Sequence, residues 1–120
     1  MVGLGLRVLS VRMCSDLLEE LDSISIKVRR SRSELIRYAV TKYGYRALSM
    51  GSYRCGDGTV IVSFKVSGAF LERLGGISRD AGVSMGEVVR RCVAMLVDDV
   101  HEGRLASPRW FGVRWVRIYV

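Results

Sequence analysis

Arg7-Val8-Leu9-Ser10-Val11-Arg12-Met13 is the stretch that decides the fold, because its side chains alternate in character along the chain. An alternation with a period of two is typical of a β-strand that buries only one face. Leu9, Val11 and Met13 would share the buried face. Val8, Ser10 and Arg12 would then share the opposite face, which remains available for contacts outside the core.

The same alternation returns 53 residues later, in Val60-Ile61-Val62-Ser63-Phe64-Lys65-Val66. Its apolar face would hold Val62, Phe64 and Val66, and its other face Ile61, Ser63 and Lys65. A strand of this length is not stable alone, because its backbone groups and its apolar face both need partners. The two stretches are therefore predicted to pair as an antiparallel two-stranded ribbon, covered on one face by helices.

Two helices are predicted after the first strand. Apolar residues recur at helical spacing from Leu17 to Val28, and acidic residues occupy the first turns, where they favour the helix dipole. Ser31 and Glu34 then have the spacing of a capping box, in which each side chain bonds the backbone of the other residue. A second helix should follow and end near Gly44.

From residue 59 the order of elements repeats at the same offset of 53 residues, after a glycine-rich linker over 44–58. Similarity at a fixed offset indicates repeated structural units. A second capping box is predicted between Ser84 and Glu87, where the offset requires it. The identical pairs are Ser10 and Ser63, Leu18 and Leu71, Glu19 and Glu72, Leu21 and Leu74, Ile24 and Ile77, Ser25 and Ser78, Ser31 and Ser84, Glu34 and Glu87, Arg37 and Arg90, and Val40 and Val93.

The composition limits the classes of function. The chain has 120 residues and a net charge of +7, which suits a polyanionic partner. No run of apolar residues is long enough to span a membrane, and no secretory signal opens the chain, so a cytoplasmic protein is expected. The single histidine, His101, gives no basis for a metal site or a catalytic triad, so neither an enzyme nor a cofactor is expected.

The chain contains three cysteines, Cys14, Cys55 and Cys92, which are far apart in the sequence and odd in number. Each is therefore expected to act as structural filler rather than in a disulfide framework.

The tail over 108–120 has the composition of a strand. It is predicted to pair with another chain or to cover the helices, and stacking on nucleic acid is the alternative. Its candidate contact residues are Trp110, Phe111, Trp115 and Tyr119.

The combination resembles the ribbon-helix-helix family of DNA-binding proteins, of the Arc, MetJ and CopG type. The resemblance rests on the alternating strand, on Leu17-Leu18-Glu19-Glu20-Leu21, and on Ser31-Arg32-Ser33-Glu34-Leu35-Ile36-Arg37. Family members usually form the unit from two identical chains, so it implies a covalent pseudo-dimer here. The fold class would be mainly α with a two-stranded antiparallel β-ribbon, in the order β-α-α, linker, β-α-α. One intertwined domain over 1–107 would contain the repeats 6–43 and 59–102, followed by the tail.

The resemblance also implies which residues would contact DNA. The paired strands enter the major groove in this family, so the base-reading residues would be Val8, Ser10, Arg12, Ile61, Ser63 and Lys65. Val8 and Ile61 depart from the expected polar character, and they either touch thymine methyl groups or pack under the N-terminal segment or the tail. The start of each second helix would face a phosphate. The phosphate-contacting residues would be Arg30, Ser31, Arg32 and Ser33, and in the second repeat Ser84, Met85 and Gly86.

Two functions of different classes follow from the resemblance. The first is sequence-specific binding of double-stranded DNA, in a transcriptional regulator that acts as a repressor. The second is an antitoxin-like interaction protein, whose tail from Pro108 onward captures a protein partner.

Overall fold

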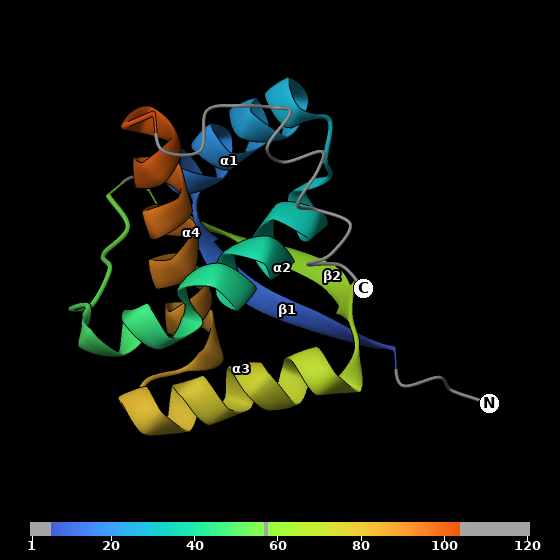
Figure 1. Cartoon of the computed structure of the whole chain (residues 1–120), viewed down its shortest axis with the longest axis vertical. Coiled ribbons are helices and arrows are strands. Elements are labelled where there is room, and N and C mark those ends of the chain that lie inside the picture. Colours follow the sequence, from blue (N-terminus) through green and yellow to red (C-terminus); the bar gives the residue numbers. More distant parts are fainter. Residues whose placement is uncertain (1–5, 57, 104–120) are drawn as a thin grey trace.

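The computed structural model describes residues 6–56 and 58–103, and its elements follow the predicted order (Figure 1). They are β1 (Arg7–Cys14), α1 (Ser15–Val28), α2 (Arg32–Tyr43), the short 3-10 helix η1 (Gly44–Ser49), β2 (Thr59–Val66), α3 (Gly68–Ala81) and α4 (Met85–His101). The one unpredicted element is η1, which occupies the first part of the linker. Within the described ranges, no helix is both long and apolar enough to cross a membrane.

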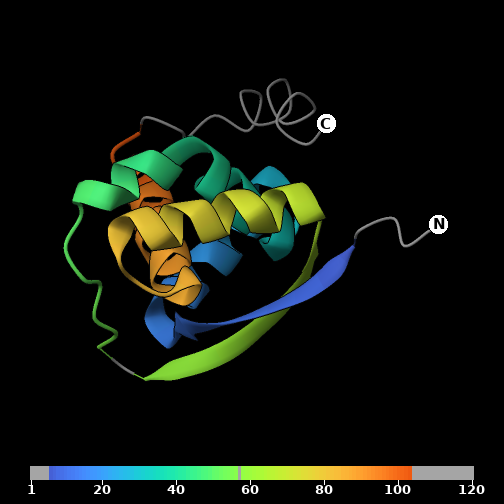
Figure 2. The same cartoon turned by 90° about the horizontal axis from the view of Figure 1, so that it is seen from below.

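The two strands form an antiparallel ribbon, as predicted, and the helices lie on one side of it (Figure 2). Ser10 is opposite Ser63 in the middle of the register, and the ends pair Arg7 with Val66 and Cys14 with Thr59. The predicted buried face is confirmed, because all six of its side chains are buried. They are Leu9, Val11, Met13, Val62, Phe64 and Val66.

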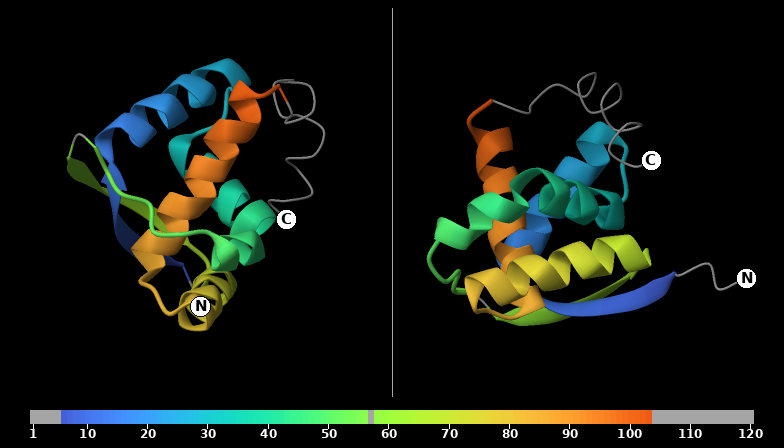
Figure 3. Two further views of the ribbon diagram at one scale, coloured as in Figure 1. Left: turned by 90° about the vertical axis from the view of Figure 1, so that its left-hand side faces the viewer. Right: turned by 60° about the horizontal axis from the view of Figure 1, so that its bottom comes forward.

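One hydrophobic core fills the space between the ribbon and the helices, and the right-hand view of Figure 3 shows the ribbon running below them. Helices α2 and α4 pack against each other, and α1 and α3 flank them. Helix side chains from both halves of the chain meet in this core. They include Leu21, Leu35, Ile36, Leu74, Ile77, Val88 and Val89. Neither half encloses the core without the other.

The helices α1 and α3 are the first helices of the two repeats, and both end in a residue with left-handed backbone conformation. The residue in that conformation differs between the two. Gly82 ends α3 with φ +69, and Arg29 ends α1 with φ 57. This left-handed conformation suits glycine, which has no Cβ, and it is unfavourable for arginine. The first turn therefore carries conformational strain that the second one avoids.

Replacing Arg29 with Gly is expected to raise the free energy of unfolding by about 1 kcal/mol, because glycine adopts the left-handed cap without strain. Urea unfolding followed by circular dichroism measures the change. Gly82→Ala is the matched control and should lower the free energy of unfolding, because alanine is strained in the left-handed conformation. A steric clash would not explain the loss, since no atom lies within 4 Å of the added Cβ. An unchanged or lower stability of Arg29→Gly would show that the side chain of Arg29 compensates for the strain.

The expectation that all three cysteines are filler is wrong for two of them. Cys14, at the end of β1, forms a disulfide with Cys55 in the linker, across a sequence separation of 41 residues. Cys92 is a buried free thiol, as expected. The spacing of the cysteines does not predict this disulfide, because the pairing depends on the path of the linker. The linker runs back to begin β2 beside the end of β1, and this brings Cys55 close to Cys14.

The first capping box is confirmed, but the second is only half formed. Ser31 and Glu34 exchange both hydrogen bonds, with Ser31 N donating to Glu34 Oε1 at 2.8 Å. Ser84 likewise accepts from Glu87 N at 3.1 Å. The carboxylate of Glu87 turns away from the cap, however, because a buried arginine of α4 requires a counter-ion.

The carboxylate of Glu87 instead joins α4 to the linker. Glu87 Oε2 accepts from Arg91 Nε at 2.8 Å and from Tyr53 N at 2.7 Å, and Glu87 Oε1 accepts from Arg90 Nη2 at 3.1 Å. Arg91 Nη1 also donates to Ala47 O at 2.9 Å. Burial opposes ionisation of Glu87, but these hydrogen bonds outweigh it and hold the pKa of its carboxyl below the usual value. We call Glu87, Arg91, Tyr53 and Ala47 the linker clamp.

Candidate nucleic-acid interface

The face of the ribbon opposite the core presents all six of the predicted base-reading side chains. The register arranges them as three cross-strand pairs, which are Val8 with Lys65, Ser10 with Ser63, and Arg12 with Ile61. All six residues are exposed. Val8 and Ile61 are 67% and 64% exposed. The segments under which they would otherwise pack, residues 1–5 and the tail, lie outside the described residues. We call these six residues the outward face.

The centre of the outward face is symmetric. Ser10 Oγ and Ser63 Oγ lie 2.7 Å apart, within hydrogen-bonding distance. Ser10 and Ser63 are also equivalent residues of the two repeats, since they are 53 positions apart. The strand register therefore pairs equivalent residues at its centre. Except for Cys14 with Thr59, every pair of the register therefore has an equivalent pair on the other side of the two serines.

The ends of the outward face are less symmetric. Arg12 Nη1 donates to Thr59 Oγ1 at 3.1 Å, across the ribbon from Arg12. Lys65 is the residue equivalent to Arg12, and Leu6 is equivalent to Thr59. Leu6 has no hydrogen-bonding side chain, so the contact that orients Arg12 has no counterpart beside Lys65.

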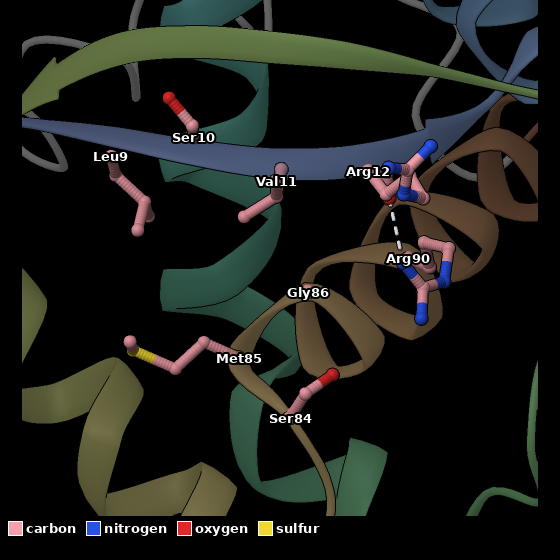
Figure 4. Close-up of a pocket in the computed structure, with 8 residues that line it drawn as sticks. All are labelled: Leu9, Ser10, Val11, Arg12, Ser84, Met85, Gly86 and Arg90. Atoms are coloured by element: carbon pink, nitrogen blue, oxygen red, sulfur yellow. Dashed lines mark hydrogen bonds between the residues drawn. The ribbon is translucent and has the colours of Figure 1, made fainter.

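A hollow of about 440 Å³ lies between β1 and the start of α4 (Figure 4). Its lining includes Ser10 and Arg12 of the predicted base-reading set and all three residues of the second predicted phosphate site, although the side chain of Ser10 points away from the helix start. The lining residues are Leu9, Ser10, Val11, Arg12, Ser84, Met85, Gly86 and Arg90. The arrangement places the first-turn backbone of a helix, whose N–H groups favour anions, directly beside the ribbon.

Two arginines at equivalent positions of the repeat connect the helices to the ribbon. Arg37 Nη1 donates to Lys65 O at 2.8 Å, and Arg90 Nη1 donates to Arg12 O at 2.6 Å. The two contacts are equivalent under the offset of 53, and each joins a helix of one half to the strand of the other. The identity of Arg37 and Arg90 in the repeat was the signal available in the sequence, but their acceptors are backbone atoms, which no sequence pattern reveals.

The first predicted phosphate site is arranged around the start of α2. Ser31 is exposed and accepts from Glu34 N at 3.1 Å, while Ser33 and Arg30 are partly buried beside it. Arg32 forms a two-pronged ion pair with Asp22, with donor to acceptor distances of 3.0 and 2.9 Å. Hydrogen bonding to Asp22 raises the pKa of Arg32 above its usual value. A phosphate at this site would compete with Asp22 for its guanidinium.

The remaining candidate residues lie elsewhere or outside the described part. His101 Nε2 is 3.0 Å from Glu20 Oε1 in an exposed contact. Within residues 6–56 and 58–103, no group of three His, Cys, Asp or Glu side chains is placed to hold a metal ion. The four predicted contact residues of the tail lie outside the described residues.

Comparison with known proteins found a match to the N-terminal part of this architecture. The model of the ribbon-helix-helix protein, copG family, matches residues 7–47, which include β1, α1 and α2. No curated protein and no solved structure matches the chain. The mainly helical fold with its two-stranded antiparallel sheet agrees with a ribbon-helix-helix unit. Residues 7–47 therefore carry the pattern of the ribbon-helix-helix family, a family of DNA-binding proteins.

Proposed function

We propose that this protein binds double-stranded DNA sequence-specifically, by inserting the β1–β2 ribbon into the major groove, and that it acts as a transcriptional repressor. The observation that carries the proposal is the register centred on Ser10 and Ser63. With residues 7–47 matching the ribbon-helix-helix family, this register supports a second unit over residues 59–102 of the same chain. The two units would form a pseudo-dimer within one intertwined domain over 1–107.

The chemistry of the outward face suits the major groove. A two-stranded ribbon fits this groove, and an arginine can bond guanine O6 and N7 with both prongs of its guanidinium. Arg12 and Lys65 supply the cations for such contacts, and the hydroxyls of Ser10 and Ser63 can donate or accept. The helices cover only the inner face, so the outward face can enter the groove without rearrangement of the core.

The helix starts on either side of the ribbon suit the phosphate backbone. Free N–H groups at the start of α2 and α4 favour an anion. At α4 the hollow beside Ser84, Met85 and Gly86 gives a phosphate room next to the ribbon. At α2 the cations of Arg30 and Arg32 supplement Ser31 and Ser33. We infer that the two helix starts anchor the DNA strands that border the groove.

Replacing Arg12 with Ala is expected to weaken binding to the preferred duplex by about 1–3 kcal/mol, because a bidentate contact to guanine is lost. The preferred duplex is first selected from a random library with the full chain. Fluorescence anisotropy then measures the dissociation constant over a salt titration, which reports the phosphate contacts.

Arg46→Ala is the charge-matched control, because Arg46 is exposed on η1 and stacks on the ring of Tyr43 at 5.5 Å, away from the ribbon. It should leave specific affinity nearly unchanged. If Arg12→Ala combined with Lys65→Ala binds the selected duplex as tightly as the natural sequence, the ribbon does not read DNA and the proposed function is wrong.

A further inference from the structure

The two ends of the outward face carry the same combination of side-chain types. Val8 lies opposite Lys65 at one end, and Ile61 lies opposite Arg12 at the other. Each end therefore presents one branched apolar side chain beside one cation. Val8 and Ile61 are also equivalent under the offset of 53, so the combination occurs symmetrically about Ser10 and Ser63.

Exposed apolar side chains on this face need an apolar surface on the ligand. Among the groups that base pairs display in the major groove, the 5-methyl of thymine is the apolar one. The cation beside each apolar side chain needs the opposite kind of group, and guanine displays two acceptors at the same edge. The two side chains of each end thus correspond to two different bases.

We propose that each end of the ribbon reads a guanine together with a neighbouring thymine, and that the end formed by Arg12 and Ile61 is the more selective. The inference rests on the proposed DNA binding and specifies its target. Cross-strand neighbours have Cβ atoms about 5 Å apart, and successive base pairs are about 3.4 Å apart, so the two bases lie in adjacent pairs. The ends are four residues apart along each strand, which corresponds to about four base-pair steps.

The difference between the ends comes from Thr59. Its hydroxyl holds Arg12 Nη1 at 3.1 Å before DNA arrives, so the guanidinium loses less freedom on binding. Lys65 has the apolar Leu6 at the equivalent position and a compact ammonium in place of a planar fork. Thr59 is a positioning residue for Arg12, and guanine should be required more strictly at that end.

The test uses the full chain and the duplex selected from a random library. Replacing one thymine at a time with deoxyuridine removes only the 5-methyl group. At the thymine facing Ile61 or Val8, this change is expected to weaken binding about fourfold, the effect of one buried methyl-sized group. In Ile61→Ala and Val8→Ala, the sensitivity to deoxyuridine should disappear at the corresponding end. Ile26→Ala is the control, since Ile26 is an 80% exposed apolar residue of α1, and it should retain the sensitivity.

A second arm tests the positioning role of Thr59. Replacing guanine with 7-deazaguanine removes the N7 acceptor and should weaken binding more at the Arg12 end than at the Lys65 end. Thr59→Val keeps the shape of the side chain and removes the hydroxyl. It should reduce the penalty for 7-deazaguanine at the Arg12 end about fivefold, the effect of one hydrogen bond, and leave the Lys65 end unchanged. If Thr59 only stabilised the fold, Thr59→Val would change the 7-deazaguanine penalty equally at both ends.

The outcomes separate this inference from the function on which it rests. Specific binding that is insensitive to deoxyuridine and to 7-deazaguanine at the ends of the site would overturn the inference and leave DNA binding in place. Failure to select any preferred duplex would overturn both. Equal guanine selectivity at the two ends would overturn the ranking of the ends.

Discussion

Replacing Glu87 with Gln is expected to lower the free energy of unfolding by about 3–5 kcal/mol, because the variant leaves a buried arginine without its counter-ion. Arg91 is only 4% exposed and Glu87 8% exposed. The charge of Glu87 therefore compensates a cation that water does not reach. Urea unfolding at neutral pH, followed by circular dichroism, measures the loss.

Glu34→Gln is the matched control, since Glu34 is the equivalent residue of the first repeat and serves a helix cap. Its cost should be about 1 kcal/mol or less. Adding Arg91→Met to Glu87→Gln should recover most of the lost stability, because the buried charge is removed along with its need for a partner. Equal costs for the two glutamate variants would mean that the linker clamp contributes no more than a cap.

The pH dependence checks the same contact. The folded state lowers the pKa of Glu87 from 4.5, so its contribution is fully present above that pH and is lost as the pH falls through the folded-state value. The natural sequence should therefore lose stability more steeply below about pH 4.5 than Glu87→Gln.

Removing the disulfide between Cys14 and Cys55 is expected to cost about 4 kcal/mol, according to the loop-entropy model for a sequence separation of 41. The double variant with both cysteines changed to Ser provides the comparison. Its midpoint of urea unfolding should lie below that of the oxidised natural chain. Addition of dithiothreitol should lower the midpoint of the natural chain and leave that of the double variant unchanged.

Cys92 supplies the control for this experiment. Burial raises the pKa of its thiol to about 12, so it stays protonated at neutral pH and does not exchange with the disulfide. Cys92→Ala should therefore keep the full response to dithiothreitol. An identical midpoint with and without reductant in the natural chain would show that the linker is held without the covalent bond.

The sequence predicted the local elements because their signals are local. Alternation in residues 7–13 and 60–66 located the two strands, and the apolar spacing after Leu17, the cap residues Ser31 and Ser84 and the repeat offset located the four helices α1 to α4. The repeat offset also indicated which strands would pair, since each strand lacked a partner within its own unit. The outward face followed from the same period of two, and its six residues are exposed as predicted.

These local patterns did not predict the contacts between segments far apart in the chain. The odd cysteine count pointed away from a disulfide, although Cys14 and Cys55 meet once the linker returns to β2. Glu87 has the spacing of a cap residue, and only the burial of Arg91 shows why its carboxylate turns to the linker. Arg37 and Arg90 bond backbone carbonyls of the ribbon, which carry no residue-specific signature.

The stretch at 7–13 by itself determined that this protein has a strand with one apolar and one outward face, because side chains in a strand alternate whatever lies around them. The tertiary structure alone decided which side chains stand together on that outward face. The register places Val8 beside Lys65 and Arg12 beside Ile61, and it allows Thr59 to hold Arg12. The physical reason is that register depends on how two distant strands meet over a shared core, and a single strand contains no information about its partner's alignment.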